Sequence, residues 1–235
     1  MALKGQTVLV VGGGRGLGRA VALASARAGA RVVVAARTRS AIDAVAGEVR
    51  ALGAEAMAVR ADARRPEDVD GIFEASRSWG TPAVVVLTVG ESLVKPFLEC
   101  TLDDYRAVID GNLTAAFVVA KAAMPRLIAR GGGRLVLVSS RVGVAGGEIA
   151  ALYGAAKAGV VNLARSLAVI GKPHGVAVHA VCPAPMDTPM RWQATPEFDR
   201  AKVIPPEAVA DMIVALAAYP SVTLEDAVVP GAIAL

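Results

Sequence analysis

A glycine-rich loop, set between a short apolar run and a helical pattern, is the feature that most constrains the fold. Residues 7–11 are apolar or β-branched, glycines follow at 12, 16 and 18, and a helical pattern begins by Arg19. Glycine lets the backbone turn sharply and approach a pyrophosphate, and free N–H groups at a helix N-terminus attract an anion. Glycine clusters are common in tight turns, but the strand before and the helix after favour a dinucleotide phosphate loop.

The rest of the chain repeats this alternation of apolar runs and helical patterns. It predicts an α/β fold: a Rossmann-type, doubly wound, seven-stranded parallel sheet with helices on both faces. We expect residues 1–235 to form a single dinucleotide-binding and catalytic domain, with a Pro- and Met-rich substrate loop over about 184–205. Strands are predicted near 6–11, 31–36, 55–60, 83–88, 134–139, 176–181 and 227–230, and helices near 16–28, 40–52, 66–79, 103–130, 152–170 and 206–218.

Composition indicates a folded protein with a large core, because 54% of the residues are hydrophobic and 20% are charged. The apolar runs are short and bounded by Gly or Pro, which is typical of buried parallel strands and not of membrane spans. The N-terminus shows no signal-peptide cleavage pattern, and two cysteines, Cys100 and Cys182, are too few for a disulfide framework. We therefore predict a cytoplasmic protein with no membrane partner.

The net charge of +4 is concentrated near the N-terminus. Residues 1–65 hold eleven Lys or Arg against four Asp or Glu, whereas the remainder holds fourteen against seventeen. No basic run, zinc-ligand spacing or aromatic–basic interleaving accompanies this charge, which argues against a nucleic-acid partner. His174 and His179 lack metal-ligand spacing, so no metal site is predicted. The positive region instead coincides with the predicted phosphate loop.

The second predicted strand ends in Arg37, where an acidic residue would accept a hydrogen bond from the ribose 2′-OH of NAD. No acid is present there, and Arg37, with help from Arg15 and Arg39, can form a fork to a 2′-phosphate. The sequence therefore predicts NADP(H) in preference to NAD(H). The alternative is that these arginines are ordinary solvated surface charge.

Tyr153 and Lys157 are four residues apart, so both side chains lie on one face of a helix. A phenol titrates near ~10, and a Lys⁺ at ~4 Å in an effective dielectric of ~20 lowers its pKa by up to roughly three units. Ser140 follows a predicted strand and Asn112 lies in a predicted helix. Taken singly, each of these residues can be explained by an ordinary role in packing, at a strand end or at a solvated position. Together they predict acid–base chemistry beside a hydride carrier.

Glycines 12, 16 and 18, with the ordered set Asn112, Ser140, Tyr153 and Lys157, resemble the short-chain dehydrogenase/reductase family of the compact single-domain type. The resemblance covers nearly the whole chain. It implies that Tyr153 is the general acid or base and that Lys157 binds the nicotinamide ribose and lowers the tyrosine pKa. It further implies that Ser140 positions the carbonyl and Asn112 holds a water in a proton relay.

The resemblance also implies a set of cofactor contacts and a homo-oligomer, a dimer or tetramer. Asp62 matches the position that contacts the adenine amino group, although a capping role before the next helix is equally consistent with it. Thr188 matches the residue that donates to the nicotinamide carboxamide. The implied cofactor-binding residues are Gly12, Gly14, Arg15, Gly16, Leu17, Gly18, Arg37, Thr38, Asp62, Ala63, Gly90, Tyr153, Lys157, Pro183, Met186 and Thr188.

The chain departs from the family pattern at residues 87–89, where Leu-Thr-Val stands in place of Asn-Asn-Ala before Gly90. Ala184 replaces a usual glycine, and Val11 a common threonine. These changes keep open a second reading, a non-catalytic NADP(H)-binding regulatory protein. The main prediction is an NADP(H)-dependent carbonyl reductase or alcohol dehydrogenase acting on a small ketone or alcohol. No cationic cluster marks a phosphorylated substrate, and an apolar substrate pocket is predicted from Val94, Pro96, Val142, Val144, Met186, Met190 and Trp192.

Overall fold

A parallel β-sheet forms the centre of the molecule in the computed structural model, which describes residues 2–218 and 228–230. The strand order is β3-β2-β1-β4-β5-β6-β7, and every pair is parallel. A three-residue strand at one edge accompanies six longer ones. This confirms the predicted doubly wound fold. The strands are β1 (Thr7–Val11), β2 (Arg31–Ala36), β3 (Ala56–Arg60), β4 (Val84–Leu87), β5 (Gly133–Val138), β6 (Val176–Cys182) and β7 (Val228–Pro230).

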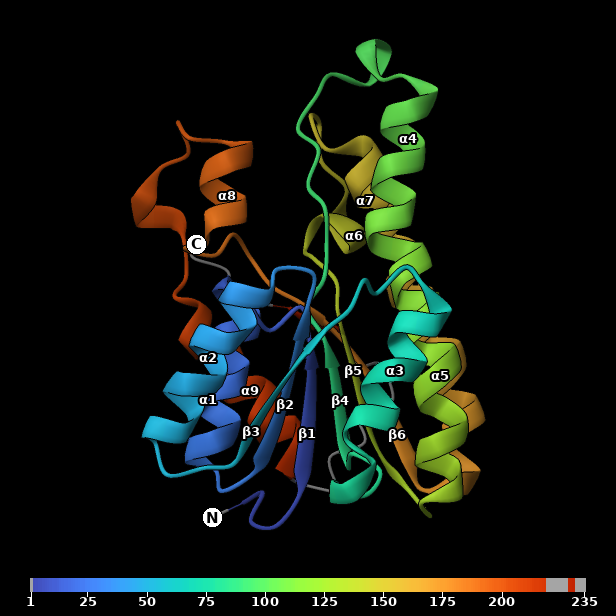
Figure 1. Cartoon of the computed structure of the whole chain (residues 1–235). Helices are drawn as coiled ribbons and strands as arrows, with labels where there is room; N and C mark the ends of the chain where they lie inside the picture. The colour runs from blue at the N-terminus through green and yellow to red at the C-terminus, as the bar shows by residue number, and fades with distance from the viewer. Residues whose placement is uncertain (1, 219–227, 231–235) are drawn as a thin grey trace.

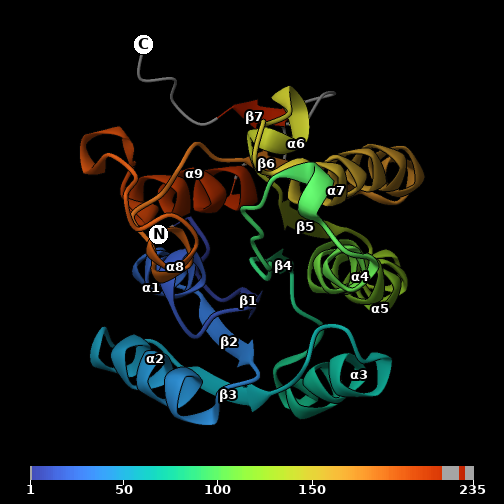
Figure 2. The ribbon, with the colours of Figure 1, turned by 90° about the horizontal axis from the view of Figure 1, so that it is seen from above.

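Helices cover both faces of the sheet (Figure 1). Seen from above, α1, α2 and α9 lie on one side, and α3, α5 and α7 on the other (Figure 2). The helices are α1 (Gly16–Arg27), α2 (Arg39–Ala51), α3 (Pro66–Ala75), α4 (Leu102–Ile109), α5 (Ala115–Ala129), α6 (Val142–Ala145), α7 (Ala151–Gly171), α8 (Pro189–Ala194) and α9 (Pro206–Ala218).

Sequence periodicity located these elements closely. Predicted bounds agree within one residue at each end, except that the helix expected over 66–79 ends at Ala75 and is followed by the 3-10 turn Arg77–Trp79. Position 227 of the last predicted strand lies outside the described residues. The short helices α6 and α8 were not predicted.

The strands read as continuous apolar runs because helices bury both faces of the sheet. Side chains alternate between the faces along each strand. In β1, Leu9 and Val11 join the core beneath α3, α5 and α7, whereas Val8 and Val10 join the core beneath α1, α2 and α9. The sheet therefore separates two hydrophobic layers.

Helices α4 and α5 are joined by a π-helical segment, Asp110–Thr114, into one run from Leu102 to Ala129. This run is long and apolar enough to cross a membrane, whereas the short apolar runs of the sequence predicted no membrane span. However, 61% of its most apolar window is buried inside the protein. Its composition is therefore that of a core helix.

The predicted substrate loop is an ordered excursion beyond β6 that contains α8. Ile204 closes it: its N–H donates to Pro185 O at 2.9 Å, and its carbonyl accepts from Asp187 N at 3.0 Å. Figure 1 shows α8 above α1, at the same end of the sheet as α4 and α6. Strand order reverses at β1, which pairs with both β2 and β4, and open parallel sheets bind ligands at such a switch point.

Candidate functional site

The loop between β1 and α1 leaves no room for a side chain at Gly12 or Gly18. Gly12 has φ +95° and Gly16 has φ +52°, values that strongly favour glycine. A Cβ on Gly12 would lie 2.6 Å from Thr88 Oγ1, and one on Gly18 would overlap the Gly12 carbonyl. No side chain caps the N-terminus of α1, so its first N–H groups are available to an anion. The loop has the form of a phosphate cradle.

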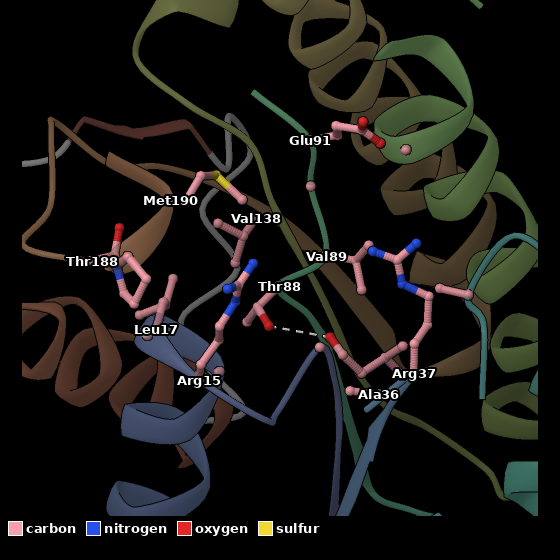
Figure 3. A pocket seen from close by; sticks show the side chains of 18 of the residues that line it. Arg15, Leu17, Ala36, Arg37, Thr88, Val89, Glu91, Val138, Thr188 and Met190 are labelled. Carbon is pink, nitrogen blue, oxygen red and sulfur yellow. Dashed lines mark hydrogen bonds between the residues drawn. The ribbon is translucent and has the colours of Figure 1, made fainter. Parts of the chain in front are cut away.

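A cavity, the cofactor cavity below, runs over this loop along the carboxyl ends of the strands (Figure 3). One end lies beside Arg37 and Asp62, and the other beside Tyr153 and Lys157. An elongated group can therefore span the phosphate cradle from the end of β2 to the start of α7. Predicted residues that line it are Gly12, Arg15, Gly16, Leu17, Gly18, Arg37, Asp62, Ala63, Gly90, Tyr153, Lys157, Met186 and Thr188.

Two exposed arginines, Arg15 and Arg37, supply positive charge to the cofactor cavity. Figure 3 shows their side chains extending from the loop after β1 and from the end of β2. Arg39 does not line the cavity, and its guanidinium donates to Asp43 at 2.7 Å. Arg64 also lines the cavity, a residue that the sequence analysis missed. Its position two residues after Asp62 was the available signal.

Asp62 is engaged by Arg64. Its carboxylate accepts from the Arg64 guanidinium at 2.6 Å and from the Arg64 backbone N–H at 3.0 Å. The hydrogen bond from the Arg64 side chain holds the Asp62 pKa at about 2, so the carboxylate is ionised at neutral pH. Asp62 thus caps a turn and also faces the cavity, so the structure is compatible with both the capping role and the adenine contact.

A second cavity, the substrate cavity below, adjoins the first. It is lined by Ser140 at the end of β5 and by Tyr153 on α7. Ser140 lies close enough to the Tyr153 hydroxyl to lower its pKa. Both predicted groups therefore meet where the two cavities join, since Tyr153 lines both. A carbonyl oxygen bound there would face a hydroxyl donor.

Lys157 differs from its expected electrostatic role. Its Nζ lies 5.8 Å from the Tyr153 ring centroid and donates to the Val138 carbonyl at 3.0 Å. Burial raises the pKa of Tyr153, and the groups that lower it in part are Ser140 and Arg191. Burial also lowers the pKa of Lys157 to about 8. Lys157 is directed at the sheet and the cofactor cavity more than at the phenol.

Asn112 is buried, not solvated. It sits in the π-helical segment, where its Nδ2 donates to Val108 O and to Glu91 O, both at 2.8 Å. Its Oδ1 accepts from Glu91 N at 3.3 Å. The side chain therefore fixes the backbone just after Gly90. It lines neither described cavity, and its carboxamide is engaged by protein groups.

Three predicted cofactor residues lie outside the cofactor cavity. Gly14 backs the loop onto α2, where an added Cβ would lie 3.2 Å from Ala41 Cβ. Thr38 is the exposed N-cap residue of α2, and Pro183 lines the substrate cavity instead. Thr188 lines both cavities. As the N-cap of α8, its Oγ1 accepts a hydrogen bond from Arg191 N at 3.4 Å.

The substrate cavity is less apolar than predicted. Val142, Met186 and Met190 line it, but Val94, Pro96, Val144 and Trp192 line neither cavity among the described residues. Trp192 points elsewhere, because its Nε1 donates to Asp187 at 2.7 Å. Two cations, Arg141 and Arg191, line the cavity and were missed. No sequence spacing linked these arginines to Tyr153.

Thr88 compensates for part of the departure at residues 87–89. Its Oγ1 donates to Val11 O at 3.2 Å, a bond between β4 and β1 drawn in Figure 3. Leu87 is buried in the core. Thr88, Val89 and Glu91 line the cofactor cavity, so this segment remains part of its wall.

The fold and the cradle define a dinucleotide-binding α/β protein with a tyrosine at the end of its cofactor cavity. The family profile described as short chain dehydrogenase matches residues 6–198, and the chain belongs to this family of oxidoreductases, whose members bind a nicotinamide cofactor. A 3-oxoacyl-[acyl-carrier-protein] reductase of Synechocystis sp. is 36% identical over 227 residues, which cover 94% of this chain and 92% of the relative. A hydroxynaphthalene reductase-like protein of Metarhizium robertsii is 37% identical over 80% of this chain and 71% of its own.

Solved structures agree with the fold. A short-chain type dehydrogenase/reductase from Mycobacterium marinum has a TM-score of 0.89 at 28% identity, covering 97% of this chain and 94% of the other. A variant of actinorhodin polyketide ketoreductase, solved with NADPH, has a TM-score of 0.89 at 27% identity, covering 97% and 95%.

Proposed function

We propose that this protein is an NADP(H)-dependent reductase that transfers hydride between the nicotinamide and a carbonyl or alcohol substrate, with Tyr153 as the general acid or base. The observation that carries this proposal is that Ser140 and Tyr153 line the substrate cavity together and that Tyr153 also lines the cofactor cavity. The relatives' names, a 3-oxoacyl reductase and a polyketide ketoreductase, support a ketone substrate.

The residues present fit a dinucleotide cofactor. A Cβ at Gly12 or Gly18 would overlap neighbouring atoms, and glycine at these positions leaves the backbone of the loop open to a pyrophosphate. Arg15 and Arg37 would hold a 2′-phosphate, and no acid follows β2 to repel it. Lys157, Thr188 and Met186 line the opposite end and would hold the nicotinamide ribose and ring.

Bound NADPH would supply a hydride to the carbonyl carbon of the substrate. Tyr153 donates its hydroxyl proton to the substrate oxygen as negative charge develops there. Burial raises the Tyr153 pKa, so this donor is protonated at neutral pH. Ser140, which lines the same cavity, donates a hydrogen bond to the same oxygen. Asn112 and Lys157 hold the segment around Gly90 in place beside them.

The test is consumption of NADPH against a panel of ketones and β-ketoesters, with Tyr153→Phe as the matched variant. We expect turnover by the native protein and a loss of at least about 100-fold in the variant, with NADPH affinity unchanged. Exposed Tyr105→Phe is the control and is expected to behave as the native protein. Turnover that survives in Tyr153→Phe would reject the assigned acid. NADPH binding without any turnover would favour the regulatory reading.

We further propose one cytoplasmic domain that assembles with copies of itself. Exposed apolar residues on α4, α5 and α7, among them Leu102, Phe117 and Ile170, support assembly through these helices. Sedimentation velocity decides the oligomeric state. A single species at the mass of one chain would reject the homo-oligomer.

A further inference from the structure

The substrate cavity contains a cation that the proposed reaction leaves without a role. Arg191, on α8, lines the cavity together with Ser140 and Tyr153, and Arg141 lies at its exposed rim. Arg191 is partly buried, and its positive charge acts on the Tyr153 hydroxyl. One guanidinium therefore faces the position where a substrate carbonyl would be protonated.

Arg191 is held in place by neutral groups. Its Nη1 donates to Thr195 Oγ1 at 2.9 Å, and its Cζ lies 4.8 Å from the Phe198 ring centroid. These contacts fix the plane of the guanidinium. They do not use its Nε–Nη2 edge, which presents two parallel N–H donors.

No carboxylate among the described residues forms an ion pair with Arg191, in contrast to Arg19, Arg39 and Arg64. Burial disfavours a charge that has no partner, and the Arg191 pKa is lowered by burial accordingly. A planar, pre-oriented guanidinium can bind a carboxylate through two parallel hydrogen bonds.

We propose that Arg191 binds a carboxylate carried by the substrate, so that the preferred substrates are short oxo acids with the carboxylate near the reacting carbonyl. This inference rests on the proposed reductase function. The carbonyl oxygen meets Tyr153 and Ser140, and the carboxylate meets the Nε–Nη2 edge of Arg191. Val142, Met186 and Met190 form the apolar wall beside the carbon chain.

The test compares pyruvate and acetoacetate with their methyl esters, which keep the shape and lose the charge. Native protein, Arg191→Gln, Arg191→Lys and Arg200→Gln are assayed with NADPH. Arg200 is the matched control, because it lies on the same segment, stacks on Trp192 at 4.1 Å and lines neither described cavity.

We expect the native protein to prefer at least one acid over its ester. Arg191→Gln should lower kcat/KM for that acid about 10- to 100-fold, with the ester changed by less than about threefold. Arg191→Lys should recover part of the lost kcat/KM. Arg200→Gln should have the same kcat/KM as the native protein. Equal losses for acid and ester in Arg191→Gln, or a native preference for both esters, would overturn the proposal.

Calorimetric titration of acetoacetate, and separately of pyruvate, into the protein with NADP⁺, which cannot reduce either acid, gives a second readout. If the native protein binds the acid and Arg191→Gln does not, the carboxylate site is supported even when no ketone is reduced. In that case only the reductase proposal fails. Absence of acetoacetate and pyruvate binding to the native protein overturns the inference.

Discussion

Lys157 and Asn112 converge on Gly90 from two different helices. A Cβ on Gly90 would lie 3.1 Å from Lys157 Nζ and 3.0 Å from Asn112 Oδ1. Each side chain is tied to a neighbouring strand or loop, Lys157 through Val138 O and Asn112 through Glu91 O. The glycine that remains from the family pattern is thus the point at which both groups are packed together.

Gly90→Ala should reduce activity more than stability. The added methyl displaces Nζ of Lys157 or the Asn112 carboxamide by a few tenths of an ångström, and small misplacements in a site are costly to rate. We expect kcat to fall about tenfold or more in steady-state NADPH assays. Gly71→Ala is the control, because an added Cβ there meets nothing within 4 Å. Native-like kcat in Gly90→Ala would contradict this role.

Gly18→Ala should destabilise the fold. Its Cβ would overlap the Gly12 carbonyl and lie 2.7 Å from Thr88 Oγ1, so backbone must move. We expect a loss of about 2–3 kcal/mol in the free energy of unfolding, measured by urea titration, together with weaker NADPH binding. In Gly71→Ala the same chemical change in an open helical position should be neutral or slightly stabilising. Equal stabilities of the two variants would show that the cradle can relax.

Arg37→Ala should change cofactor preference. Loss of a charge-assisted contact to the 2′-phosphate should raise the Kd for NADPH about 10- to 100-fold and leave that for NADH nearly unchanged. Arg39→Ala is the matched control, since Arg39 pairs with Asp43 and does not line the cavity. Fluorescence titration measures both affinities. The assignment fails where the NADPH-to-NADH ratio is the same in both variants.

Ser140→Ala should move the alkaline limb of the pH–rate profile. The Ser140 side chain lowers the Tyr153 pKa, so its removal raises that pKa further. Ketone reduction needs the protonated phenol, and its rate falls as pH rises through the Tyr153 pKa. We therefore expect a lower kcat plateau whose alkaline limb lies at higher pH. A limb that stays in place or moves to lower pH would remove Tyr153 as the titrating group.

Lys157 should make stability increase with pH. Its pKa is about 8 in the fold, below the ordinary 10.5, so the unfolded chain binds more protons between these values. Stability then rises as pH rises through this window, by about 2 kcal/mol between pH 8 and 10 relative to Lys157→Met. Lys121→Met, an exposed change on α5, should keep the native pH dependence. Parallel pH curves for native protein and Lys157→Met would contradict the burial of an ammonium group.

The strand and helix positions were predictable because burial on both faces makes each strand a continuous apolar run. Glycines and prolines then mark where the elements end. The π-helical segment Asp110–Thr114 was not predictable, because it adds one residue to a turn without changing the apolar pattern. Helix α8 was missed for a related reason: six residues are too few to display periodicity.

In the candidate site, the phosphate loop and Tyr153 could be located because their residues are close together in the sequence. Arg191 could not, since its approach to Tyr153 depends on how the excursion after β6 folds back through Ile204. The hydrogen-bond partners of Arg39 and Lys157 were not predictable for another reason. Each has a nearer partner, Asp43 or Val138 O, that only the three-dimensional arrangement reveals.

The two cavities share part of their walls. Five residues line both of them: Ser139, Tyr153, Met186, Thr188 and Met190. Thr188 also packs against the phosphate loop, 3.4 Å from where a Cβ on Gly16 would lie. A molecule that settles in one cavity therefore fixes side chains that the other must use. Thermodynamic reciprocity then requires that each occupant change the affinity for the other by the same factor, so this common wall couples the two binding equilibria.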